Sequence, residues 1–333
     1  MATMKDVAKL AGVSVSTVSI VINGKAKERS IPTSTYDKVM HAIEELNYRP
    51  NITARRLRSS NETKVFVLFW PFDARTEMLG TLLSGIQKEL AKQQYTCEVL
   101  VRTYTNNKIE HSFRDALNNM YDGIIIGGTS EQDLNYLESI SIHTPVVLIN
   151  RESQKYSTVY VSEYDIAQTC VQLLKERNIR EIGVIRSTEK YVASSQRIES
   201  LIQSCKNSDI KADICFSVSD SYEGGILAAT KYLELSDHPK YVICESDVIA
   251  LGMLYEFNHQ KIRIPEELSL LTLGSTHNDY TAFCTPSLSV IALPSEAITS
   301  HAITQLIKLS KDSKLPVMHD NIPPEINLRE SFI

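Results

Sequence analysis

The sequence predicts an α/β protein with an N-terminal three-helix helix-turn-helix head, followed by two doubly wound parallel-sheet subdomains. The first observation is that residues 3–46 hold three short stretches with apolar residues at helical spacing. The second is that short apolar runs alternate with helical stretches from residue 64 onward, which is typical of parallel sheets covered on both faces. The third is the length of 333 residues, which is too long for one small core.

Residues 3–23 predict two helices joined by a tight turn. Thr3 and Asp6 have the spacing of a capping box, in which the hydroxyl accepts from an unpaired amide and the carboxylate favours the positive helix end. Gly12 supplies a turn that needs no Cβ. The expected apolar face of the first helix consists of Val7, Ala8, Leu10 and Ala11.

Ser14 is the predicted N-cap of the second helix. We expect the buried side of that helix to consist of Val18, Val21 and Ile22. A third helix opens at Pro32 and Ser34, and its expected buried face consists of Val39, Ala42, Ile43 and Leu46. Three short helices in this arrangement are typical of a small DNA-binding bundle.

Residues 50–60 form the predicted hinge between a head, residues 1–49, and a core, residues 61–333. Asn51 can cap a helix of about two turns there, which is marginal in water because nucleation costs more than so few hydrogen bonds return. Arg55, Arg56 and Arg58 surround Leu57, and this pattern favours ordering against phosphates. A plain linker is the alternative interpretation.

The core contains short apolar runs that predict buried strands, namely VFVLFW, CEVLVR, GIIIGG, PVVLIN, IGVIR, YVICES and LSLLTL. Residues 78–93 and 166–176 are examples of the helical stretches between them. The core is long enough for two such sheets, and we expect the chain to cross between them near residues 161, 292 and 320. The cleft between them, at the carboxyl ends of the strands, is the expected ligand site.

Charge is distributed unevenly along the chain. Residues 1–60 hold ten Lys or Arg against five Asp or Glu, whereas the rest hold 25 against 35. A basic head on an acidic body predicts an anionic partner for the head, although basic solvated faces are also common.

Composition argues against a metal site and a membrane span. Six scattered cysteines form no CxxC pair, so buried free thiols are expected at Cys97, Cys170, Cys205, Cys215, Cys244 and Cys284. No run of about 18 apolar residues occurs, and the N-terminus lacks the basic-then-apolar pattern of a signal region. We therefore expect a cytoplasmic protein with no cofactor and no membrane partner.

The segments MKDVAKLAGVSVSTVS and NYRPN, with Ala54 and Leu57 after them, resemble the LacI/GalR family of bacterial transcription regulators. IPEELSLLTLG and PPEINLRES resemble later segments of the same family, so the resemblance covers essentially the whole chain. It implies a homodimer with a DNA-binding head, a hinge helix and a periplasmic-binding-protein-like core.

The resemblance implies that the second helix enters the major groove of DNA, with Val15, Ser16 and Ile20 at base-reading positions. Leu57 matches the hinge leucine that wedges into a minor-groove step, with Ala54 one turn before it. Ile20 replaces an arginine that is common in the family, so we expect DNA deformability to carry more of the specificity. Family positions that hold phosphates are matched by Thr3, Ser14, Thr17, Ser19, Asn23 and Tyr48. The hinge adds Asn51, Arg55 and Arg58 to the expected DNA-contacting set.

In the cleft, Arg197 matches the family arginine that grips the effector, and a surface helix arginine is the alternative. Asn150 stands where an aspartate is common. Ser246 stands where an asparagine is usual, whereas Asp247, the next residue, matches the family. Gly274 replaces an aspartate that often binds sugar hydroxyls, and this loss removes charge-assisted hydrogen bonds. The predicted substitutes at the mouth of the cleft are Phe72, Asp73 and Arg75, with Tyr222 as a stacking platform or a core aromatic.

Together these features predict a sequence-specific regulator, a repressor of carbohydrate-utilisation genes, that binds a palindromic double-stranded DNA operator. A sugar, or a sugar phosphate gripped by Arg197 and Arg75, is the expected small-molecule effector. The same kind of regulator controlled by a protein co-repressor, with no cleft ligand, is the alternative. An enzyme is a third alternative, which the sequence argues against because it contains no G-x-S-x-G, P-loop or glycine-rich dinucleotide turn.

Overall fold

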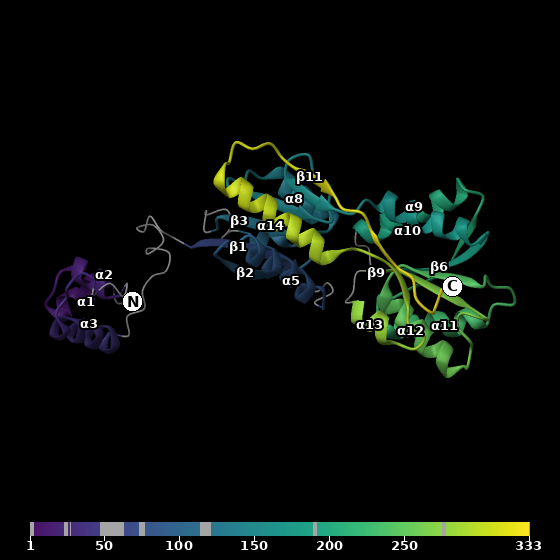
Figure 1. The fold of residues 1–333 in the computed structure, drawn as a ribbon, viewed down its shortest axis with the longest axis horizontal. Helices are drawn as coiled ribbons and strands as arrows, with labels where there is room; N and C mark the ends of the chain where they lie inside the picture. Colours follow the sequence, from purple (N-terminus) through teal and green to yellow (C-terminus); the bar gives the residue numbers. More distant parts are fainter. Residues whose placement is uncertain are drawn as a thin grey trace. The chain divides into compact units, whose positions relative to one another are not determined.

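The structure is a computed structural model that describes residues 3–22, 26, 28–46, 63–72, 77–113, 121–188, 192–274 and 278–332. The chain divides into two compact units, Met1–Glu62 and Thr63–Ile333. Figure 1 labels many of the helices and strands. The predicted hinge, residues 50–60, lies outside the described residues.

The described part of the first unit consists of α1 (Met4–Ala11), α2 (Val15–Ile22) and α3 (Thr33–Glu45). Thr3 and Asp6 form the predicted capping box: the Thr3 amide donates to the Asp6 carboxylate at 2.8 Å, and the Asp6 amide donates to the Thr3 hydroxyl at 3.4 Å. Gly12 follows with φ of 66°, a left-handed conformation that glycine adopts without strain. The predicted cap and turn are both confirmed.

A small apolar core holds the three helices together. Its buried members are Val7, Ala8, Ala11, Val18, Val21, Ala26, Val39 and Ala42. The expectation for Leu10 was wrong, because its side chain is 46 % exposed. Leu10 lies roughly 60° outside the arc of α1 that Val7, Ala8 and Ala11 occupy, and so short a helix buries only a narrow stripe.

Within the described residues, six parallel strands form the first sheet of the second unit, in the order β11-β5-β4-β3-β1-β2. They are β1 (Lys64–Pro71), β2 (Cys97–Tyr104), β3 (Gly123–Ile126), β4 (Val146–Ile149), β5 (Ser157–Tyr160) and β11 (His319–Asn321). Alternate residues of β1 pack on opposite faces of the sheet, with Phe66 and Leu68 on one and Val65 and Val67 on the other. The first face is covered by α5 (Glu77–Lys92) and α14 (Ser295–Lys311), and the second by α6 (Ile109–Ser112) and α8 (Glu131–Ser139).

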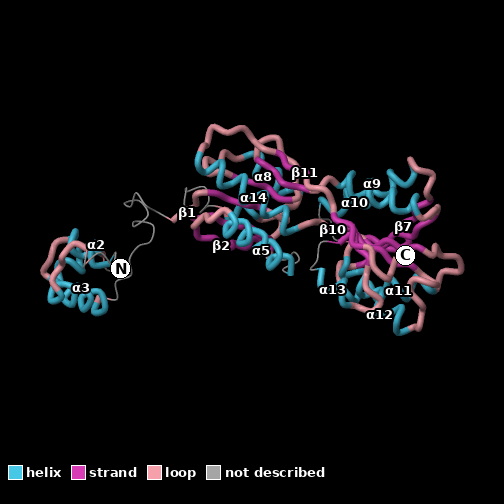
Figure 2. The backbone as a smooth tube through the Cα atoms, viewed as in Figure 1, coloured by secondary structure: helices cyan, strands magenta, loops and turns pink. Residues whose placement is uncertain are grey.

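Six further strands of the described chain form the second sheet, in the order β12-β10-β9-β8-β6-β7, and only β12 runs antiparallel to its neighbour. They are β6 (Glu181–Ser187), β7 (Lys211–Val218), β8 (Tyr241–Cys244), β9 (Ser269–Gly274), β10 (Ser289–Ala292) and β12 (Glu325–Asn327). Figure 2 shows these strands between two pairs of helices, α9 (Glu163–Glu176) with α10 (Val192–Lys206), and α11 (Tyr222–Leu233) with α12 (Asp247–His259). The predicted fold class, a helical head followed in the chain by two sheets with helices on both faces, is confirmed.

The described chain passes between the two sheets at three points. It leaves β5 for α9, returns from β10 to α14, which packs on β3, β4 and β5, and leaves β11 for β12. Asn321, at the end of β11, links two of these crossings, because its Oδ1 accepts from the Ser162 amide at 3.1 Å and its Nδ2 donates to Asp165 Oδ2 at 2.7 Å. One amide side chain therefore holds the first and the third crossing together.

Two expectations about apolar residues need correction. The run CEVLVR was expected to be a fully buried strand, but β2 lies at the edge of its sheet, and Leu100 and Val101 are each 36 % exposed. All six cysteines are free, yet only Cys170, Cys205 and Cys244 are buried, whereas the other three are half-buried. No helix among the described residues is long and apolar enough to span a membrane.

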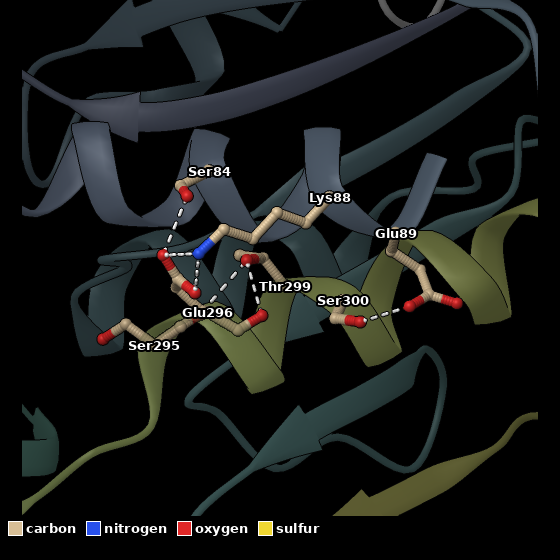
Figure 3. Close-up of polar contacts among 7 residues, drawn as sticks. All are labelled: Ser84, Lys88, Glu89, Ser295, Glu296, Thr299 and Ser300. Carbon is tan, nitrogen blue, oxygen red and sulfur yellow. Dashed lines mark hydrogen bonds and ion pairs between the residues drawn. The ribbon is translucent and has the colours of Figure 1, made fainter. Parts of the chain in front are cut away.

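Helices α5 and α14 pack closely against each other (Figure 3). A Cβ on Gly85 would overlap the Thr299 hydroxyl and the backbone of Glu296, whose Cα would lie at 2.8 Å. Beside this contact, the Glu296 carboxylate accepts from Ser84 Oγ at 2.8 Å and from Lys88 Nζ at 2.7 and 2.9 Å. The absence of a side chain at Gly85 therefore allows the two helices to approach and to form these polar contacts.

Gly85→Ala is expected to lower the free energy of unfolding by about 1–3 kcal/mol, because the added methyl group overpacks the contact between the helices. Gly80, on the same helix, has no atom within 4 Å of its would-be Cβ and serves as the matched control. Gly80→Ala should raise the stability by up to about 1 kcal/mol through helix propensity. Urea denaturation measures both, and a Gly85→Ala variant as stable as Gly80→Ala would contradict the close approach.

Glu89 lies 8 % exposed between the same two helices and is surrounded by donors. Its carboxylate accepts from Gln93 Nε2 at 2.8 Å, Ser300 Oγ at 2.9 Å, Lys92 Nζ at 3.3 Å and Thr304 Oγ1 at 3.4 Å. The hydrogen bonds from Gln93, Ser300 and Lys92, that from Gln93 first, lower the pKa of Glu89 from its usual 4.5 to about 2. The ionised carboxylate therefore joins α5 to α14.

Glu89→Gln is expected to destabilise the protein at neutral pH and to leave it less sensitive to acid. Because the native pKa is depressed, the ionised form of Glu89 stabilises the fold above its usual pKa of 4.5, and that contribution is lost as the pH falls toward 2. The gap in unfolding free energy between the wild type and the variant should shrink over that range. Glu266→Gln, at an exposed position, is the control. A difference in unfolding free energy between the wild type and Glu89→Gln that stays constant from neutral pH down to about pH 3 would contradict the stabilising role of the ionised Glu89.

Candidate functional site

The start of α2 forms an exposed surface on the first unit. Val15 is 37 % exposed and Ser16 is exposed, while Ser19 and Ile20, one turn further on, are half-buried. Their spacing places all four on one side of the helix, while the opposite side packs into the core of the head. The predicted base-reading residues Val15, Ser16 and Ile20 are thus together on that side.

Three predicted phosphate-contacting hydroxyls lie at the N-termini of α1 and α2. Ser14 caps α2 by accepting from the Thr17 amide at 3.0 Å, and the Ser14 and Thr17 hydroxyls are 2.9 Å apart. Thr3 caps α1. Helix N-termini favour anions, because their amides are unpaired and the helix dipole is positive there. The remaining predicted DNA contacts lie outside the described residues: Asn23, Tyr48, Asn51, Ala54, Arg55, Leu57 and Arg58.

The second unit contains a cavity of about 190 Å³ between elements of its two sheets. Its lining includes residues that follow β4 and β5 in the first sheet and one residue of α10, which covers the second sheet. The carboxyl ends of parallel strands are the expected place for a ligand in such folds. The described lining consists of Leu134, Asn150, Arg151, Glu152, Tyr160, Val161, Glu163 and Gln196.

Arg197, the predicted effector-gripping arginine, is paired with a lining carboxylate. Its Nε donates to Glu163 Oε2 at 2.8 Å and its Nη2 to Glu163 Oε1 at 3.2 Å, while Nη1 is 3.5 Å from the Leu273 carbonyl oxygen. The Arg197 side chain is only 5 % exposed and the Glu163 side chain 16 %. Glu163 therefore lies at the wall of the cavity, and Arg197 holds it there in a two-pronged pair.

A second arginine, Arg151, is buried in the wall of the cavity. Its Nε donates to the Thr129 carbonyl oxygen at 2.8 Å, its Nη2 donates to the same oxygen, and its Nη1 donates to the Asn150 carbonyl oxygen at 2.5 Å. Burial lowers the pKa of Arg151 from its usual value, while Tyr104 and Glu163 act against this shift. Asn150 adopts a left-handed backbone with φ of 53°, and its side-chain Oδ1 is buried with no hydrogen-bond partner in the described structure.

Other predicted cleft residues are placed differently. Ser246 is fully buried at the N-cap of α12, where its hydroxyl accepts from the Ile249 amide at 3.3 Å and donates to Asp220 Oδ1. Tyr222, at the start of α11, is 50 % exposed, and Phe72 is 72 % exposed. None of these three is in the described cavity lining. Asp73 and Arg75 lie outside the described residues.

Gly274 lies directly against Asp247. A Cβ at position 274 would be 3.1 Å from Cβ, Cγ and Oδ2 of Asp247, whose side chain is buried. An aspartate at position 274 would therefore bring a second carboxylate beside the first. A side chain at position 274 would therefore require the Asp247 side chain to shift.

The sequence did not single out the acidic and aromatic residues of the cavity wall, Glu152, Tyr160 and Glu163. The available signal was position: Arg151 and Glu152 directly follow Asn150, and Glu163 follows the strand that ends at Tyr160. Among the described residues, no cluster of three or more His, Cys, Asp or Glu is arranged to hold a metal ion. The described wall offers hydrogen-bonding groups.

The two units match different family models. Residues 3–51 match the model described as bacterial regulatory proteins, lacI family, and residues 171–332 match a periplasmic binding protein-like domain. The ribose operon repressor of Haemophilus influenzae is 27 % identical over 100 % of this chain and 99 % of its own length. This chain belongs to the LacI family of bacterial regulatory proteins.

Further relatives of this LacI-family regulator support the same family. The transcriptional repressor CytR of Escherichia coli is 28 % identical over 92 % of this chain and 89 % of its own. A LacI family transcription regulator from Clostridium acetobutylicum has a crystal structure with a TM-score of 0.75 and 28 % identity, which covers 80 % of this chain and all of that one. The lac repressor dimer bound to operator and an anti-inducer shares the fold, with a TM-score of 0.74 at 20 % identity over 99 % of this chain and 98 % of that one. The family predicted from the sequence is confirmed.

Restoring the family aspartate should destabilise this LacI-family chain. Gly274→Asp is expected to lower the free energy of unfolding by about 2 kcal/mol or more at neutral pH, because two buried carboxylates would lie side by side. The loss should lessen as the pH falls and one carboxylate takes up a proton. Gly274→Ala is the steric control, with a cost of about 1 kcal/mol and no pH dependence. Equal losses in the two variants at every pH would contradict the charge conflict.

Proposed function

We propose that this chain is a homodimeric repressor of carbohydrate-utilisation genes, which binds a palindromic operator and responds to a small ligand in the cavity of its second unit. The observation that carries the proposal is the exposed side of α2, where Val15 and Ser16 stand free of the core within a segment that matches the lacI family. A relative named ribose operon repressor, similar over the whole chain, supports the link to carbohydrate genes.

The head supplies two kinds of contact to DNA. Hydroxyls at the starts of α1 and α2, with the excess of Lys and Arg in residues 1–60, favour the phosphate backbone and set the register of the head. Val15, Ser16 and Ile20 are the groups that reach base edges in the major groove. Because Ile20 offers only apolar contact, the base-reading set is small.

The cavity supplies a means of control. Its described lining comes from α8 and the ends of β4 and β5 in the first sheet, and from α9 and α10 over the second. A ligand held there contacts both halves of the second unit, so its affinity depends on how the halves are arranged. Only such a difference in affinity between two arrangements allows a ligand to change the protein's activity.

The test begins with selection of duplex DNA from a random pool by the full-length protein. The double variant Val15→Ala/Ser16→Ala should then bind the selected sequence at least about tenfold more weakly, since a good base contact contributes roughly 1–3 kcal/mol. Its weak, salt-sensitive binding to unrelated DNA should persist, because that binding comes from phosphate contacts. Ser34→Ala, an exposed serine on α3, is the matched control. Failure to select any sequence, or unchanged binding by the double variant, would contradict the proposal.

A further inference from the structure

The exposed side of α2 carries apolar side chains at positions from which a recognition helix reaches base edges. Val15 and Ile20 lie there together with Ser16 and Ser19. On the basis of the proposed function, we propose that α2 reads its operator through the C5-methyl groups of thymine in the major groove, which Val15 and Ile20 contact. The T·A pairs of each half-site are then distinguished by apolar contact instead of by paired hydrogen bonds.

The turn of the helix separates these four residues from the side that faces the core. At about 100° per residue they occupy an arc of about 140°, with Val15 and Ile20 at its two edges and the serines between them. The buried valines of α2 lie on the opposite side. Within the described head, Ile22 packs against the core, whereas neither Val15 nor Ile20 belongs to it. The apolar surface of these two side chains is therefore left for a partner.

Helix α2 lacks the side chains that recognise the other base edges in pairs of hydrogen bonds. Arg or Lys recognises guanine in this way and Asn or Gln recognises adenine, while a carboxylate accepts from cytosine. None of these residue types occurs in Val15–Ile22, whose sequence is VSTVSIVI. A serine hydroxyl both donates and accepts, so Ser16 and Ser19 discriminate little between bases. Only the apolar groups allow α2 itself to distinguish one base from another.

Thymine is the base that an apolar side chain recognises in the major groove. Its C5-methyl group is the one apolar group in the pattern by which the four bases differ there. Burying one methyl group changes the affinity by about fourfold, because apolar surface is removed from water. A polar base edge against Val15 or Ile20 would lose its water without gaining a hydrogen bond, which is unfavourable.

The spacing of the two apolar side chains fits separate base pairs. Val15 and Ile20 are about 7.5 Å apart along the helix axis, because each residue advances about 1.5 Å. Base pairs are stacked at about 3.4 Å, so this distance corresponds to about two steps. The excess of Lys and Arg in residues 1–60 and the hydroxyl caps of α1 and α2 favour phosphate contacts that bring α2 to the groove.

The deciding experiment uses the wild-type full-length protein and the duplex obtained by the DNA selection described above. Each thymine of a half-site, together with its symmetry mate, is replaced in turn by deoxyuridine. Deoxyuridine pairs with adenine as thymidine does but lacks the C5-methyl group. At least one replacement is expected to weaken binding by about fourfold for each contacted methyl group removed. Thymines in the flanks of the selected site are the control and should change nothing.

A second substitution separates the methyl group from the rest of the base. Replacing a contacted T·A pair by C·G removes the methyl group and changes the hydrogen-bonding pattern, and 5-methylcytosine then restores the methyl group alone. The methylated duplex should bind about fourfold more tightly than the unmethylated one for each methyl group restored. Readout by hydrogen bonds would produce no such gain. Both duplex series require no variant, so they hold whether or not a substituted protein folds.

Two variants assign the contacts to α2. In Val15→Ala or Ile20→Ala the shortened side chain no longer reaches its methyl group, so replacing that thymine by deoxyuridine should now cost less than about twofold. Removing a methyl group also alters how DNA bends, and this coupling distinguishes a direct contact from deformability. Leu10→Ala, at a 46 % exposed apolar position of α1, is the matched control and should retain every loss.

Three results would overturn the inference: a selected operator in which no deoxyuridine replacement weakens binding, no gain from 5-methylcytosine, or losses that persist unchanged in folded Val15→Ala and Ile20→Ala proteins. The selection itself separates this inference from the proposed function. Selective DNA binding that does not depend on methyl groups would retain the regulator and discard the thymine contacts. Failure to select any duplex would reject both.

Discussion

The buried ion pair between Glu163 and Arg197 holds the chain at the point where it passes from the first sheet to the second. Glu163 is the first residue of α9, and Arg197 lies on α10, beside the end of β9. Two charges removed from water are tolerated only when their geometry is good and their remaining polar atoms are satisfied, and the forked contact with the Leu273 carbonyl nearby meets that condition. The position of α9, and with it one wall of the cavity, depends on this pair.

The second constraint is the way the two sheets share one chain. Because the described chain crosses between the sheets three times, neither sheet is built from one continuous segment. Asn321 links the first and the third crossing. The second crossing leads into α14, which is held by its contact with α5. That contact needs the missing side chain at Gly85 and the ionised Glu89. A ligand in the cavity lies among these connections, so it is well placed to sense how the halves are arranged.

Local features of the chain were largely predictable. The capping box of Thr3 and Asp6, the left-handed turn at Gly12 and the apolar strand runs depend on neighbouring residues, and most of them match the structure. The two incorrect predictions of burial, for Leu10 and for the strand β2, have the same physical cause. Leu10 and the strand β2 have the right composition for burial, but what covers a helix face or a sheet edge is set by distant segments.

The sequence by itself determined the fold class, the LacI family and the set of residues that face outward from α2, because caps, periodicity and motif spacing are local properties. It also predicted a ligand site at the ends of the parallel strands, where the structure has a cavity. Only the tertiary structure decided which side chains line that cavity. Glu163 and Arg197 are 34 residues apart, and Gly274 and Asp247 belong to different elements, so no local pattern could reveal that the first pair brings a carboxylate to the cavity wall or that Gly274 lies against Asp247. The physical reason is that charges are paired by proximity in space, which the spacing of residues along the chain does not encode.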